Sequence, residues 1–100
     1  MSAESQREQR DLQALRGEIA FGLDVEQFMG TPLGQYLRRR ANDDIEAARD
    51  ALVTVDPEDV KAVRKLQNDA MAAARFLVWL GDAVTAGENA QAAFKETPAD

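Results

Sequence analysis

Apolar residues recur along the chain at the three- and four-residue intervals that are typical of amphipathic helices. The first such series consists of Leu12, Leu15, Ile19 and Leu23. It predicts a helix over roughly residues 5–21, and the Ser5-x-x-Glu8 spacing is that of a capping box at its start. Gly17 and Gly22 weaken the end of this helix, because glycine is a poor helix former.

Two further helices are predicted to begin before the middle of the chain. A short one covers residues 24–29, and Gly30 ends it. Thr31-Pro32 then marks a new start, since threonine is a good N-cap and proline is tolerated at the first helical position. The spacing predicts a helix over residues 32–54, with a seam that consists of Leu33, Leu37, Ala41, Ile45, Ala48, Leu52 and Val55.

A long last helix is predicted over residues 57–94. Asp56-Pro57 repeats the combination of an N-cap residue and a following proline. The positions that follow alternate in steps of three and four, as in a heptad seam with small residues in its middle. They are Val63, Leu66, Ala70, Ala73, Leu77, Leu80, Val84 and Gly87. Residues 97–100 are expected to fray.

These elements predict an all-α fold: an antiparallel helical hairpin with a long C-terminal helix, plus an N-terminal helix. The link at Val55 and Asp56 is so short that the helices it joins must be antiparallel neighbours. At 1.5 Å per residue, helix 32–54 spans about 34 Å and helix 57–94 about 57 Å, so the longer one extends past its partner beyond about Val78. The N-terminal helix either packs along that extension, giving an elongated molecule, or folds back into a three-helix bundle.

Composition limits the chemistry that the chain can perform. Its 100 residues suit a single helical domain, and 18 of them are alanine, so the core is thin. The chain contains no cysteine and no histidine, which removes thiolate zinc sites and the commonest general base and metal ligand near neutral pH. It also has no glycine-rich phosphate loop or nucleophile motif. We therefore predict a protein that is not an enzyme and that uses no cofactor or metal.

The charge balance bears on partners and location. A formal net charge of −6 argues against general binding to nucleic-acid backbones, which requires a basic surface. No apolar run approaches the roughly 18 residues of a membrane span, and the polar N-terminus is not typical of a signal peptide. These features predict a cytoplasmic protein without a membrane partner.

Four side chains form the candidate protein interface: Trp79, Val84, Phe94 and Phe28. Trp79 lies beside the seam, on a stripe that it shares with Arg75 and Asp82. It either packs under the segment 21–30, or it anchors an interface, a role in which tryptophan is enriched. Phe94 either touches the first helix or docks onto another subunit.

The basic residues form a second candidate contact, which consists of Arg38, Arg39, Arg40, Lys61, Arg64 and Lys65. Consecutive helix positions lie about 100° apart, so the three arginines splay around the axis. Asp43 and Asp44 follow one turn later and can pair with two of them, which favours a solvated face. Glu46 and Asp50 share a helix face, but a carboxylate metal site in a bundle normally includes histidine, so they too are interpreted as solvated.

Several segments resemble small uncharacterised all-helical proteins of tailed bacteriophages and prophages. These segments are residues 17–28, 31–37, 55–59, 66–68 and 79–80. The resemblance covers roughly residues 17–88 and carries over no functional residues. It implies a phage accessory or virion-associated protein, expressed among head and packaging genes, in the cytoplasm of the bacterial host or in the virion.

Three hypotheses for the function remain. The first is a structural or assembly protein whose helices dock on a second copy or on a larger phage component, as a homo-oligomer or part of a larger assembly. The second is an acidic regulatory or inhibitory binder that mimics DNA, and the third is a weak nucleic-acid binder through the basic end. The first predicts a salt-tolerant apolar contact, whereas the other two predict salt-sensitive binding. The partner, the oligomeric state and packing of the N-terminal helix in cis or in trans stay open.

Overall fold

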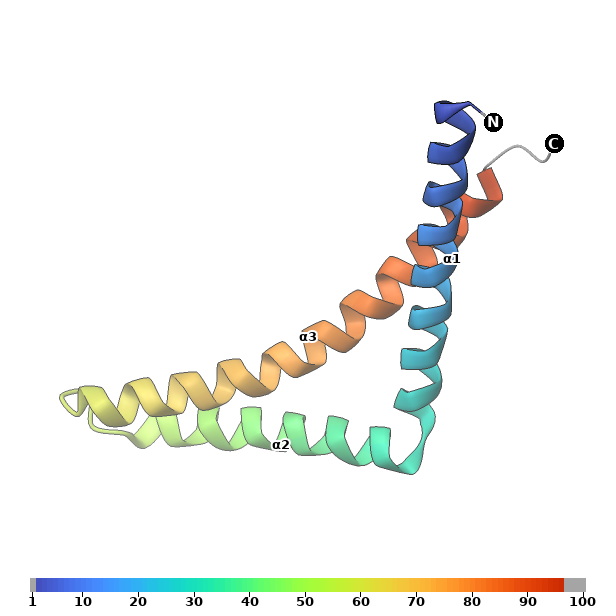
Figure 1. Cartoon of the computed structure of the whole chain (residues 1–100). Coiled ribbons are helices and arrows are strands. Elements are labelled where there is room, and N and C mark those ends of the chain that lie inside the picture. Colours follow the sequence, from blue (N-terminus) through green and yellow to red (C-terminus); the bar gives the residue numbers. More distant parts are fainter. Residues whose placement is uncertain (1, 97–100) are drawn as a thin grey trace. The chain divides into compact units, whose positions relative to one another are not determined.

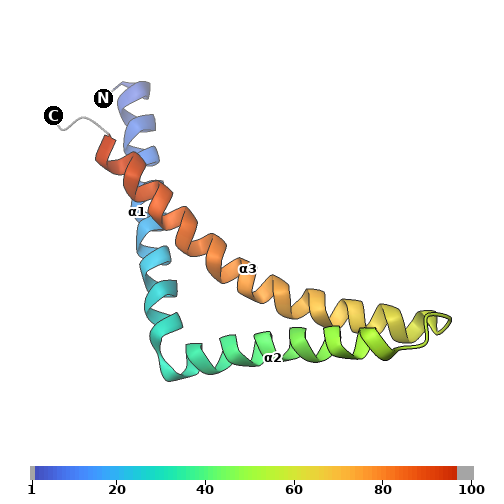
Figure 2. The same cartoon turned by 180° about the vertical axis from the view of Figure 1, so that it is seen from behind.

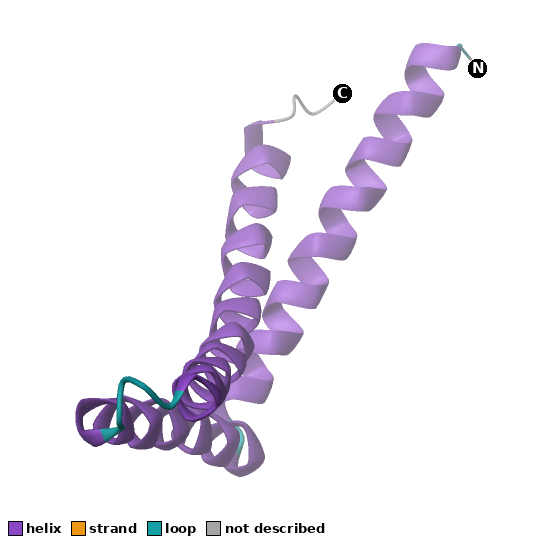
Figure 3. Ribbon diagram, turned by 90° about the vertical axis from the view of Figure 1, so that its left-hand side faces the viewer, coloured by secondary structure: helices purple, strands orange, loops and turns teal. Residues whose placement is uncertain are grey.

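The computed structural model describes residues 2–96, and every regular element within that range is an α-helix (Figures 1 and 3). The helices are α1 (Ala3–Gly30), α2 (Pro32–Thr54) and α3 (Val60–Glu96). The predicted all-α class is thereby confirmed, and residues 2–96 form three helices. The fraying expected of residues 97–100 lies outside the described residues.

Helix α1 is continuous, so the prediction of separate helices over residues 5–21 and 24–29 is wrong. The capping box at Ser5 is also misplaced. The helix begins at Ala3, and the Ser2 hydroxyl accepts a hydrogen bond from the Ser5 backbone N–H at 3.2 Å. The helix continues through Gly22 because that glycine packs against another helix, as described below, and this contact offsets its poor helix propensity.

Helix α2 has the predicted bounds, 32–54, and the predicted start signal. Thr31 has extended backbone geometry, and its hydroxyl accepts a hydrogen bond from the Gly34 backbone N–H at 3.0 Å. Pro32 follows in the first turn, where the missing N–H has no helical partner to lose. At the other end, the Val55 N–H donates to the Ala51 carbonyl at 3.0 Å and closes the last turn.

Helix α3 begins at Val60, so the predicted start at Pro57 is wrong. The Asp56 carboxylate accepts a hydrogen bond from the Glu58 N–H at 2.9 Å, which closes a turn instead of a helix. The N-cap is Asp59, whose carboxylate accepts from the Ala62 N–H at 3.1 Å. Asp56 and Asp59 thus both carry a capping signal. Asp59 caps α3, whereas Asp56 stabilises the turn in the loop that reverses the chain.

Because Asp59 caps α3, we expect the substitution Asp59→Ala to lower the free energy of unfolding by about 1 kcal/mol. The neighbouring Glu58→Ala is the matched control, since only the backbone of Glu58 takes part in the turn. Urea unfolding followed by circular dichroism measures both. Equal stability of the two variants would contradict the assignment of Asp59 as the cap.

Contacts divide the described chain into two compact units, each of them a helix pair. Unit 1 combines α1 as far as Phe28 with α3 from Leu80 onward, and unit 2 runs from Met29 to Trp79. In unit 2, α2 and the first part of α3 lie side by side and run in opposite directions (Figures 1 and 2). In unit 1, the part of α3 beyond this hairpin packs with α1 of the same chain, which is one of the two arrangements that the sequence left open.

The two helices of unit 1 are in near backbone contact at a pair of glycines. A Cβ atom added to Gly22 would lie 3.0 Å from the Cα of Gly87 and 3.1 Å from the carbonyl oxygen of Ala83. A Cβ added to Gly87 would lie 3.0 Å from the Cα of Gly22 and 3.2 Å from the Glu18 carbonyl oxygen. The helices therefore cross where neither carries a side chain.

Unit 2 has a core of small residues. Ala41 and Ala48 of α2 face α3 and are only 6% and 4% exposed. Among the described residues, no large side chain is fully buried. Alanine seams permit close helix approach but bury little apolar area, so each unit has the thin core that the composition predicts.

Candidate protein-binding surface

One face of α3 carries large apolar side chains that the chain leaves uncovered. Trp79 is 67% exposed, Val78 55% and Met71 52%. Together with Arg75 they occupy positions i, i+4, i+7 and i+8 of a helix, which lie on one face. We call Met71, Arg75, Val78 and Trp79 the α3 stripe. The Trp79 indole is exposed, which fits the interface anchor among its two expected roles.

The other three predicted interface residues belong to unit 1 and are partly covered. Phe94 is half-buried, and the Arg16 guanidinium of α1 lies 5.5 Å from the centre of its ring. Val84 is half-buried and lines a small cavity beside the glycine crossing. Phe28 is also half-buried. The four predicted residues therefore divide between the two units, and Phe94 has the contact with the first helix that was one of its two expected roles.

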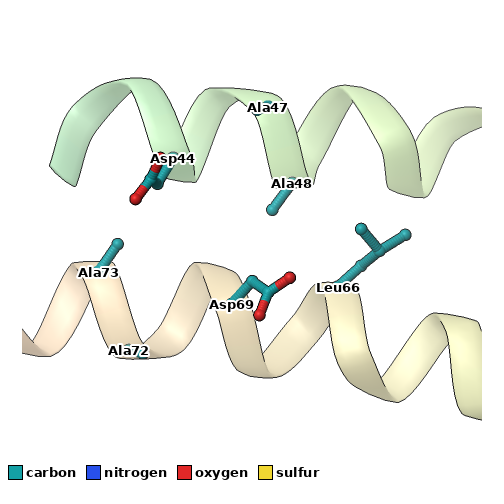
Figure 4. Close-up of a pocket in the computed structure, with 7 residues that line it drawn as sticks. All are labelled: Asp44, Ala47, Ala48, Leu66, Asp69, Ala72 and Ala73. Carbon is teal, nitrogen blue, oxygen red and sulfur yellow. The ribbon is translucent and has the colours of Figure 1, made fainter. Parts of the chain in front are cut away.

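A groove runs along one side of the α2–α3 pair in unit 2. One part has a volume of about 460 Å³, and it is lined by Asp44, Ala47, Ala48, Leu66, Asp69, Ala72 and Ala73 (Figure 4). An adjoining part of about 220 Å³ is lined by Leu37, Arg40, Ala41, Asp44, Ala73 and Phe76. Because the two parts share Asp44 and Ala73, they form one continuous surface, which we call the α2–α3 groove. Alanines leave this space open, since a methyl group does not fill it.

Two carboxylates from opposite helices lie at the groove, and Figure 4 shows both between the helices. Asp44 accepts a hydrogen bond from Arg40 Nε at 3.3 Å, and Asp69 accepts one from Lys65 Nζ at 3.1 Å. Hydrogen bonds to Tyr36 and then Asp44 raise the pKa of Arg40 above its ordinary value. Both ion pairs are exposed, and such pairs contribute only about 0–1 kcal/mol. Each carboxylate can therefore accept a further donor.

The six predicted basic residues lie in two groups at opposite ends of unit 2. Arg40 on α2 lies beside Ala73 and Phe76 of α3. Lys65 lies farther toward the start of α3, next to Leu66, which lines the groove opposite Ala48. Arg38 and Arg39 are exposed and line a shallow surface with Gln35 and Asn42, and Lys61 and Arg64 are exposed at the start of α3. Because the helices are antiparallel, the groups do not join into one basic patch.

Within residues 2–96, no group of three or more histidine, cysteine, aspartate or glutamate side chains is placed to hold a metal ion. None of the three described helices combines the length and the apolar character needed to cross a membrane.

No protein-family model matches the chain, and neither a curated protein nor a solved structure does. The resemblance to phage proteins therefore stays a prediction.

Proposed function

We propose that this chain is a non-enzymatic assembly protein that binds other protein surfaces through the exposed apolar side chains of unit 2. The observation that carries the proposal is the exposure of Trp79, Val78 and Met71 on one helix face. Tryptophan is enriched among the residues that dominate binding energy at protein interfaces. Burial of such side chains by a partner contributes about 25 cal/mol per Å² of apolar area.

The thin core supports the same proposal. The buried hydrophobic residues of the described chain are alanines: Ala41, Ala48 and Ala90. A pair of helices covers one face of each helix and leaves the remaining faces to solvent, whereas bundles bury apolar positions from several sides. A protein partner that supplies a further helix face would complete the core of unit 2, and this gives the chain a physical reason to bind.

The proposal extends to a phage virion-associated or head-assembly accessory role, in the bacterial cytoplasm or in the virion. The support for this part is the sequence resemblance. The two rival hypotheses gain no specific support, because positive charge at Arg40 and Lys65 interrupts the acidic faces and the basic residues are dispersed.

A photo-crosslinking residue in place of Val78 tests the proposal in the cells that make the protein. We expect covalent adducts with protein, either a second copy or another component, when the crosslinker is at Val78. The same residue in place of Glu46, an exposed polar position on α2, is the control and should give none. Absence of protein adducts at Val78, or equal yields at both positions, would contradict the proposal.

A further inference from the structure

The α2–α3 groove has a definite pattern of charge and space. The two carboxylates, Asp44 and Asp69, lie near its middle, and an apolar or alanine-lined hollow lies to each side of Asp44. One hollow reaches Leu37 and Phe76, and the other reaches Leu66. A complementary helix would have one basic side chain in the middle of its contact face and an apolar side chain one turn to either side.

The α3 stripe has this pattern. Arg75 is preceded by Met71 four residues earlier and followed by Trp79 four residues later, so each apolar side chain lies about 6 Å along the helix from the arginine. The groove has a similar spacing along α2. Asp44 lies about one turn from Ala47, which lines one hollow, and about one turn from Arg40, which lines the other. Within residues 2–96, the Arg75 side chain has no hydrogen-bond or ion-pair partner.

The stripe and the groove of one chain cannot meet. Both belong to unit 2, and α3 contributes to both. Asp69, Ala73 and Phe76 line the groove, and Trp79 lies at its edge, seven residues after the groove-lining Ala72. Met71, Arg75 and Val78 lie on another face of the same rigid helix. The stripe can therefore enter a groove only on a second copy.

We propose that the α2–α3 groove binds the α3 stripe of a second copy of this chain, with Arg75 of that copy between Asp44 and Asp69. The planar guanidinium donates hydrogen bonds in a fork that suits two carboxylates. Trp79 and Val78 occupy the hollow at Leu37 and Phe76, and Met71 occupies the hollow at Leu66. This inference rests on the proposed function, because it names the partner of the same apolar surface.

A charge-exchange experiment on the purified full-length chain tests this pairing by light scattering. The wild-type protein is expected to associate into multiples of its 11.0 kDa mass as its concentration rises. Arg75→Glu and the double variant Asp44→Arg/Asp69→Arg should each weaken self-association more than about tenfold, because each places like charges in contact. Arg49→Glu lies on another face of α2 and changes the net charge by the same amount as Arg75→Glu, so it should associate like the wild type.

Mixing the two deficient variants in equal amounts should restore association. The double variant retains Arg75, and the Arg75→Glu variant retains both aspartates, so one native contact can form between them. Ala47→Trp is an uncharged check, since it fills the groove from an exposed position and should also prevent self-association. Circular dichroism confirms that each variant is helical.

Three results would overturn the inference: a wild-type monomer at every concentration, an Arg75→Glu variant that associates normally, or a mixture that does not associate. Each of these results would leave the proposed function, binding of a protein partner by this surface, still open to its own test. Crosslinking of Val78 to a different protein in cells would then show that the surface binds a foreign partner.

Discussion

The substitution Gly22→Ala is expected to lower the free energy of unfolding of unit 1 by about 1–2 kcal/mol, because overpacking by one methyl costs about 1–3 kcal/mol and outweighs the helix propensity that it adds. The new Cβ would lie 3.0 Å from the Cα of Gly87, and backbone cannot give way as a flexible side chain does. Gly17→Ala in the same helix meets nothing within 4 Å. It is expected to raise stability by about 0.5–1 kcal/mol through propensity alone.

The opposite signs of these two effects make the experiment decisive. Thermal and urea unfolding by circular dichroism measure stability, and hydrogen exchange of the α1 amides locates the change. A second matched pair exists on α3: Gly87→Ala should destabilise, whereas Gly81→Ala, with nothing within 4 Å, should not. If Gly22→Ala proved as stable as Gly17→Ala, the helices would not cross at the glycines.

The second large effect is expected from Ala48→Leu. Ala48 is 4% exposed where α2 contacts α3, and extra methyl groups at this contact crowd α3 even though the residue also borders the groove. Such overpacking typically costs about 1–3 kcal/mol. The adjacent Ala47 is exposed and lines the open groove, so Ala47→Leu should change stability by less than about 0.5 kcal/mol. Leucine and alanine have similar helix propensities, so a difference in stability between the Ala48→Leu and Ala47→Leu variants reports on packing.

Urea unfolding of both alanine variants checks this prediction, at a protein concentration low enough to avoid association. Hydrogen exchange of the α2 amides should accelerate in Ala48→Leu and not in Ala47→Leu. Equal losses of stability in the two variants would mean that Ala48 does not lie in the seam.

Local signals in the sequence predict much of the fold. The Thr31-Pro32 start and the seam that follows give the bounds of α2 because cap and periodicity agree there. The continuity of α1 is not predictable in this way. The penalty at Gly22 is local, whereas the contact that offsets it comes from Gly87, which is distant in sequence. The start of α3 is ambiguous because Asp56 and Asp59 both carry a capping signal, and only the geometry of the chain reversal decides between them.

The candidate surface is predictable only in part. Trp79 attracts attention as the single tryptophan. Met71 and Val78 are not among the predicted interface residues although their helical spacing from Trp79 is visible in the sequence, because they lie off the heptad seam and Arg75 gives the stripe a polar character. The α2–α3 groove depends on which alanines of two helices face each other, and periodicity on a single helix does not determine that.

The central claim is that the chain leaves Trp79 uncovered and that a protein partner covers it. Fluorescence of this single tryptophan, with acrylamide as the quencher, tests it most directly. We predict red-shifted, readily quenched emission from the dilute monomer, and blue-shifted, protected emission once the protein associates. Protected emission from the monomer would contradict the claim, as would an equally exposed tryptophan in the associated protein.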